Sequence, residues 1–219
     1  MSVALPEPCL CLVTDRNLAV GNDLVRRVSL AVEGGVDMVQ LREKDLSRSQ
    51  LLKLATELRN AVGTRALLIV NGQPEVSAEA EAQGVQLGEG SMPVEAARKL
   101  LPPGSLVGRS VHGVETALDA ASEGVDFLVV GTMYATDSHP GLPPGGPALM
   151  RAVAQGCRVP LIGIGGITRD NLSEVVAAGA SGVAVIRSIL PADDPGAAAR
   201  GLKQSLTDAW RSRPLLTNP

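Results

Sequence analysis

The chain has 219 residues, of which 45% are hydrophobic, and a formal net charge of −3. This length suits one large α/β domain with a full apolar core. Three aromatic residues and the lack of a basic block exclude a nucleic-acid surface built on base stacking or positive charge. No apolar run approaches the roughly 18 residues of a membrane span, and no signal-peptide pattern opens the chain.

The three cysteines, Cys9, Cys11 and Cys157, are too few and too scattered for a disulfide framework or a structural zinc site. Cys9 and Cys11 are two positions apart in an apolar run, so they should share one face of a strand. We therefore expect the three cysteines to be small core residues. We also expect a cytoplasmic protein that binds neither nucleic acid nor membrane. The sequence does not define the oligomeric state, and a homo-oligomer stays open.

Strand and helix patterns alternate along the whole chain. The short apolar segments that we expect to form strands are 10–14, 38–41, 66–70, 85–87, 106–110, 127–130, 160–164 and 182–186. The segments with helical spacing are 24–33, 48–62, 74–82, 93–101, 114–123, 148–154, 172–178 and 195–210. Strict alternation predicts a parallel sheet with helices outside, and eight units predict a closed (βα)8 TIM barrel. We expect one domain over 1–219, with the barrel at roughly 9–210.

A weak repeat precedes every second predicted strand. It comprises Glu33-Gly34-Gly35, Gln83-Gly84, Glu123-Gly124 and Ala178-Gly179. Glycine is the expected residue just after a helix, where the backbone turns into the left-handed region. The repeat therefore indicates paired βα units.

A candidate phosphate site lies at the ends of the last two predicted strands. One strand is followed by Gly165 and Gly166, with Thr168 or Asp170 as the expected helix cap, and the other by Arg187 and Ser188. Adjacent glycines can direct backbone N–H groups at an anion, and the helix behind them would add donors. This arrangement resembles the phosphate site of TIM barrels, although two ordinary glycine turns would give the same pattern.

Polar side chains follow the other predicted strands, where barrel enzymes place their chemistry. The candidates are Gln40, Arg42, Lys44, Asn71, Ser110, His112, Thr136, Ser138 and His139. His112 is the candidate proton carrier, because histidine titrates near neutral pH, with Glu43 as an alternative acid or base. No strand end offers paired carboxylates, so metal ligation has little support. The segment 140–147 is interpreted as a lid or pocket wall, or else as a surface loop.

An ordered set of motifs resembles the thiamine phosphate synthase/TenI superfamily, whose fold is a TIM barrel. The motifs are V-T-D-R at 13–16, Q-L-R-E-K at 40–44, V-N at 70–71, G-R-S-V-H at 108–112 and G-I-G-G-I-T at 163–168. The resemblance implies one of two activities. A synthase couples a pyrimidine diphosphate to a thiazole phosphate and releases pyrophosphate, and a TenI-type tautomerase aromatises a carboxythiazole ethyl phosphate without metal.

The chain departs from the synthase pattern at three positions. The two aspartates that hold Mg²⁺ in synthases are replaced by Gly72 and Ser91, and a lysine that holds pyrophosphate is replaced by His139. Pyrophosphate departure depends on metal and cationic charge to stabilise the leaving group. The segments 85–91, 110–112 and 136–138 resemble the TenI branch. They include His112, at the position where that branch has a histidine implicated in proton transfer.

Our main prediction from the sequence is therefore a thiazole tautomerase that uses no cofactor and no metal. The resemblance implies that His112 moves the proton, while Gly165, Gly166, Ile186 and Arg187 hold the phosphate of a thiazole phosphate. It implies a substrate-binding role for Gln40, Arg42, Lys44, Asn71, Ser110, Thr136 and Ser138. The alternatives are a thiamine phosphate synthase, which would require Mg²⁺, and a non-catalytic regulator that binds thiazole phosphates.

Overall fold

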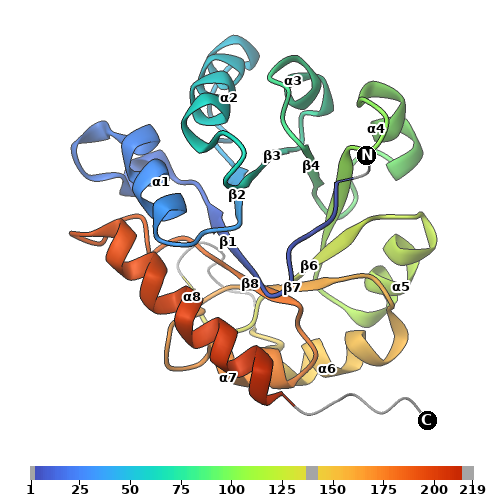
Figure 1. Ribbon diagram of the computed structural model, residues 1–219. Coiled ribbons are helices and arrows are strands. Elements are labelled where there is room, and N and C mark those ends of the chain that lie inside the picture. The colour runs from blue at the N-terminus through green and yellow to red at the C-terminus, as the bar shows by residue number, and fades with distance from the viewer. Residues whose placement is uncertain (1–2, 137–142, 214–219) are drawn as a thin grey trace.

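Eight parallel strands close into a barrel in the order in which they occur in the chain, with the helices outside (Figure 1). A computed structural model describes residues 3–136 and 143–213. The strands are β1 (Cys9–Val13), β2 (Met38–Leu41), β3 (Leu67–Asn71), β4 (Gly84–Leu87), β5 (Leu106–Val111), β6 (Phe127–Gly131), β7 (Leu161–Ile164) and β8 (Gly182–Val185). The predicted (βα)8 TIM barrel is confirmed.

The helices follow the strands in strict alternation. They are α1 (Leu24–Glu33), α2 (Arg48–Val62), α3 (Pro74–Glu79), α4 (Val94–Leu100), α5 (Val114–Ser122), α6 (Gly146–Gly156), α7 (Leu172–Ala177) and α8 (Pro195–Ser212). Two short 3-10 helices, η1 (Arg16–Leu18) and η2 (Val20–Asn22), connect β1 to α1 and were not predicted from the sequence. No helix in the described ranges has both the length and the apolar composition needed to cross a membrane.

The apolar core has two parts, because side chains on each strand alternate between the barrel interior and the helix layer. Cys9, Cys11 and Val13 point into the interior, where Phe127 and Ile162 also lie. The larger part fills the space between strands and helices. The expectation that Cys9 and Cys11 share one buried face is confirmed, and burial raises the pKa of the Cys11 thiol to about 12.

The amino-terminal segment crosses one end of the barrel before it enters β1 (Figure 1). Val3 and Leu5 pack against the interior apolar cluster and cover this end. Asp37 accepts hydrogen bonds from the Leu10 amide and from Lys203 Nζ on α8, each at 2.7 Å. These contacts stabilise the amino-terminal end and leave the carboxyl end of the strands for a binding site.

The predicted cap of α7 is wrong. Its N-cap is Asn171, and neither Thr168 nor Asp170 occupies that position. Asn171 instead uses its side-chain oxygen to accept a hydrogen bond from the Thr168 amide at 2.9 Å. Thr168 therefore remains in the turn after β7.

The glycine repeat has two structural meanings. Gly35, Gly124 and Gly179 have φ of 107°, 81° and 113°, as expected just after a helix. Gly84 differs, because it is the first residue of β4, paired with Leu106. A Cβ at Gly84 would lie 2.1 Å from the carbonyl oxygen of Leu106, so glycine permits close approach of two strands there.

We expect Gly84→Ala to lower the free energy of unfolding by about 1–3 kcal/mol, because the added methyl group forces β4 and β5 apart. Chemical denaturation of the two proteins measures the change. Gly88→Ala is the matched control, since a Cβ at Gly88 has no neighbour within 4 Å. Equal stability of the two variants would contradict the packing argument.

Candidate functional site

A cavity of about 650 Å³ opens at the carboxyl ends of the strands. Our main prediction from the sequence gave roles to twelve residues, and eleven of them line this cavity. They are Gln40, Arg42, Lys44, Asn71, Ser110, His112, Thr136, Gly165, Gly166, Ile186 and Arg187. The twelfth, Ser138, lies outside the described residues, as do His139 and part of the segment 140–147. The structure thus places the candidates together, while their individual roles stay predictions.

A layer of hydrogen-bonded amides and hydroxyls connects the barrel interior to the cavity. Gln40 Nε2 on β2 donates to Asn71 Oδ1 on β3 at 3.1 Å. Gln86 Nε2 on β4 donates to Ser110 Oγ on β5 at 3.0 Å. Gln40 and Gln86 are buried, so these bonds fix the orientation of the side chains that the cavity exposes.

Positive charge enters the cavity from the loop after β2. Arg42 and Lys44 both line it, whereas the intervening Glu43 points away and is buried. The side chains of Arg42 and Lys44 have no hydrogen-bond or ion-pair partner among the described residues. We call these two residues the cationic edge. It can bind a carboxylate, phosphate or diphosphate group of a ligand.

Another part of the cavity wall is formed by the turns after β7 and β8. Gly165 and Gly166 have φ of 103° and 61°, a region that favours glycine. A Cβ at Gly165 would lie 2.5 Å from Thr132 Cγ2, and one at Gly166 would lie 2.7 Å from the carbonyl oxygen of Ala135. The Ser188 hydroxyl donates to the Ile167 carbonyl at 2.7 Å and joins the two turns.

The expected contribution of a helix terminus to this site is not observed. α7 has six residues and begins at Leu172, which does not line the cavity, whereas Gly165 to Thr168 do. The glycine turn itself therefore faces the ligand space, and its backbone is the candidate anion-binding element.

His112 forms a pair with Glu89, and both residues line the cavity. The ring Nδ1 of His112 lies 2.6 Å from Glu89 Oε2, and the His112 amide donates to Glu89 Oε1 at 3.4 Å. Burial acts to raise the pKa of Glu89, but hydrogen bonds from Thr116 and His112 outweigh it and lower the pKa below the usual 4.5. An ionised Glu89 accepts a hydrogen bond from a protonated Nδ1 of His112, and this bond fixes the orientation of the imidazole ring.

The carboxylates expected of a magnesium site do not lie around the cavity. Among its described lining residues Glu89 is the single acid, and no cluster of three metal-binding side chains occurs in the described ranges. Gly72 and Ser91, at the positions of the synthase aspartates, do not line the cavity. These residues do not fit a Mg²⁺ ion held by paired carboxylates.

Sequence reasoning missed several residues of the cavity wall. Glu89 after β4, and Thr132 and Ala135 in the loop after β6, line the cavity but were not among the candidate residues. The inward-facing apolar residues Val13, Val129 and Ala184 also reach the cavity floor. Alternation along each strand indicates which residues face the barrel interior, but it does not indicate which of them lie at the open end.

Comparison with known proteins identifies the family. A family model described as thiamine monophosphate synthase matches residues 10–189. The chain belongs to this family. It is 40% identical over 202 residues to a thiamine-phosphate synthase of Methanoculleus marisnigri, covering 91% of this chain and 96% of that protein. It is 42% identical over 195 residues to a putative thiamine-phosphate synthase of Geobacter sulfurreducens, covering 88% and 92%.

A solved structure agrees with these relatives. Thiamine phosphate pyrophosphorylase from Pyrococcus furiosus superposes with a TM-score of 0.83 at 32% identity, covering 92% of this chain and 96% of that one. The superfamily resemblance found in the sequence is confirmed, and the substrates of this family are small molecules.

The comparisons contradict our main functional prediction from the sequence. The tautomerase is an isomerase, whereas these relatives are named as synthases, which are transferases. The error was to treat the missing aspartates as loss of the site. The cationic edge and the turn at Gly165 and Gly166 line the cavity without them, because they follow other strands.

The lowered pKa of Glu89 predicts how the stability of the folded protein depends on pH. A carboxylate with a depressed pKa in the folded state adds stability above its unfolded pKa, and this stability is lost as pH falls through the folded value. We expect the melting temperature of the native protein to fall more steeply below about pH 4.5 than that of Glu89→Gln. Glu95→Gln, on α4, is the control, and identical acid limbs for native protein and Glu89→Gln would refute the prediction.

Proposed function

We propose that this protein couples a pyrimidine diphosphate to a thiazole phosphate and releases pyrophosphate. The proposal rests on synthase relatives and on one cavity lined by two sets of candidate anion-binding residues, the cationic edge and the turns after β7 and β8. Two phosphorylated substrates must lie together for coupling, and each set suits one of them. A tautomerase would also present two anionic groups, the carboxylate and the phosphate of one ligand, so the synthase relatives are what favour coupling.

The diphosphate is assigned to the cationic edge. Arg42 offers a planar guanidinium and Lys44 an ammonium, and the two can contact separate phosphate oxygens. The negative charge on the leaving group grows as its carbon–oxygen bond breaks. Cations at this position stabilise that charge more in the transition state than in the bound substrate.

The thiazole phosphate is assigned to the turns after β7 and β8. Gly165 and Gly166 line the cavity and pack closely against the segment after β6, and backbone N–H groups of such a turn can bind a phosphate oxygen. Ile186 and Arg187 complete this end after β8. Backbone donors are rigid, so they orient the thiazole ring toward the other substrate.

The coupling step needs little covalent chemistry from the protein. The thiazole nitrogen gives its electron pair to the pyrimidine methylene carbon, and the bond from that carbon to the diphosphate oxygen breaks with its electrons on the oxygen. Between the two ends, the amides of Gln40 and Asn71 and the Ser110 hydroxyl can hydrogen-bond the heterocycles. The main contribution of the site is to align nucleophile and leaving group.

Purified protein given both substrates and MgCl₂ should form thiamine phosphate and pyrophosphate, detected by chromatography. Arg42→Gln and Lys44→Gln should each lower kcat/KM for the diphosphate about 10- to 100-fold, because each removes a charge from the leaving group. The control is Lys53→Gln, an exposed lysine of α2. Absence of product with native protein would refute the function, whereas normal turnover by both cationic-edge variants would refute only the assignment of the diphosphate.

The absence of paired carboxylates around the described cavity predicts weak binding of divalent cations. We expect the substrate-free protein to bind Mg²⁺ no more tightly than about 1 mM, since high affinity requires several carboxylate ligands. Isothermal titration calorimetry with MgCl₂ measures this directly. A dissociation constant below about 0.1 mM would place metal ligands among the residues outside the described ranges.

A further inference from the structure

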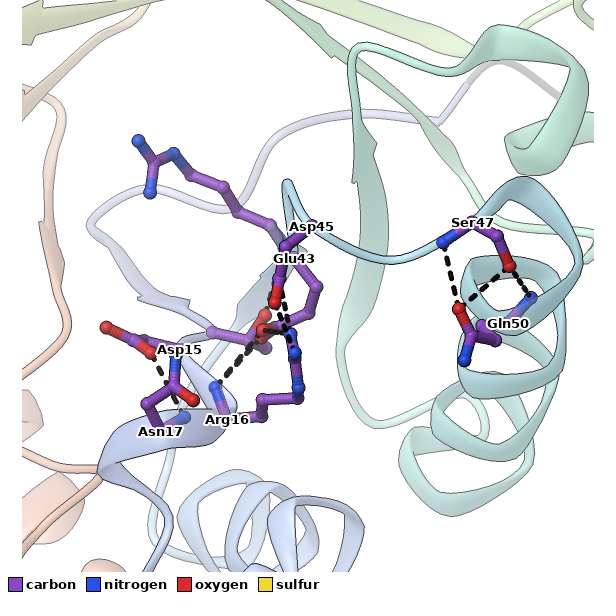
Figure 2. Close-up of polar contacts among 9 residues, drawn as sticks. Asp15, Arg16, Asn17, Glu43, Asp45, Ser47 and Gln50 are labelled. Atoms are coloured by element: carbon purple, nitrogen blue, oxygen red, sulfur yellow. Dashed lines mark hydrogen bonds and ion pairs between the residues drawn. The ribbon is translucent and has the colours of Figure 1, made fainter.

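Arg16 binds two carboxylates that would otherwise adjoin the cationic edge. Its Nη1 lies 3.2 Å from Glu43 Oε2, and its two terminal nitrogens both contact the Asp45 carboxylate (Figure 2). The Arg16 backbone N–H also donates to the Glu43 carboxylate, at 3.1 and 3.2 Å to the two oxygens. We call Arg16, Glu43 and Asp45 the Arg16 cluster.

The flanking structure holds both sides of the Arg16 cluster in place. Arg16 opens η1, where the Asp15 side chain caps the turn by accepting from the Asn17 amide. Asp45 lies two residues before Ser47, which forms a reciprocal capping box with Gln50 at the start of α2 (Figure 2). Thr14 connects the two strand ends, since its hydroxyl accepts from the Arg42 amide at 2.9 Å.

The sequence order of charges explains why this cluster matters for ligand binding. Residues 42 to 45 read Arg, Glu, Lys, Asp, so two cations and two carboxylates alternate and their formal charges cancel. Unpaired carboxylates at Glu43 and Asp45 would reduce the positive potential at Arg42 and Lys44. Arg16 restores one net positive charge and engages both carboxylates on the side away from the cavity.

The two carboxylates differ in burial. The Glu43 side chain is 2% exposed, so it needs its cationic partner and amide donors inside the protein. The Asp45 side chain is 64% exposed, and hydrogen bonding from Arg16 lowers its pKa to about 2. Asp45 therefore stays ionised at neutral pH with or without Arg16, and loss of Arg16 would leave its charge uncompensated near Lys44.

We propose that Arg16 is a positioning residue that sequesters Glu43 and Asp45. The positive potential at Arg42 and Lys44 then stays available to an anionic ligand. The cationic edge lines the cavity without a protein partner among the described residues, whereas the neighbouring acids contact Arg16. The ligand chemistry is a diphosphate. This identification rests on the proposed function, but the sequestration itself is a property of the binding site.

The test measures binding of inorganic pyrophosphate by titration calorimetry at low ionic strength, without any coupling assay. Arg16→Gln should weaken pyrophosphate binding about tenfold, because it releases two carboxylates beside the cations. The control is Arg48→Gln, which removes an equal charge from α2, where Arg48 pairs with exposed Glu79. Its effect should stay below about twofold, as expected for a surface pair.

A triple variant separates sequestration from a purely structural role. Adding Glu43→Gln and Asp45→Asn to Arg16→Gln removes the competing carboxylates, so pyrophosphate affinity should return to within about threefold of native. If Arg16 only held the loop in shape, the triple variant would bind as weakly as Arg16→Gln or more weakly. That result, or native affinity in Arg16→Gln, would overturn the proposal.

The double variant Glu43→Gln/Asp45→Asn, which keeps Arg16, provides the answer if Arg16→Gln does not fold. Sequestration predicts that this variant binds pyrophosphate at least as tightly as native protein, and a loss above about threefold would overturn it. Pyrophosphate binding without coupling would refute the proposed function and leave this inference standing. A native protein that binds no pyrophosphate would refute the inference.

Discussion

The alternation of side chains along a strand is the constraint on which the site depends. In a closed barrel one set of positions faces the interior and the other faces the helices. Past the end of β2 this alternation directs Arg42 and Lys44 to the cavity and Glu43 to the opposite side. Charges adjacent in sequence are thereby separated into a ligand-binding set and a set held by Arg16.

The two candidate anion-binding elements of the cavity differ in physical character. The cationic edge uses flexible side chains, whose charge is available wherever a phosphate oxygen lies. The glycine turn uses backbone groups in conformations that exclude other residues. Neither element includes the positions of the missing aspartates, which is why Gly72 and Ser91 were misleading as functional indicators.

His112 and Glu89 form a second kind of arrangement within the same cavity. A carboxylate at Nδ1 fixes the imidazole orientation, and the Glu89 charge is maintained by hydrogen bonds despite partial burial. The resemblance in the sequence indicated the histidine but not its carboxylate partner. They are 23 positions apart in the sequence, and the pairing of β4 with β5 brings them together.

The sequence alone determined the fold and most of the candidate site, because hydrophobic periodicity repeats eight times and polar residues follow the strands. The boundaries of α1, α2 and β2 matched the structure, since caps and apolar spacing agree locally. Only tertiary structure decided the role of Gly84, the partner of His112 and the position of Glu43. Each depends on a contact with another βα unit, and local patterns carry no information about such distant partners.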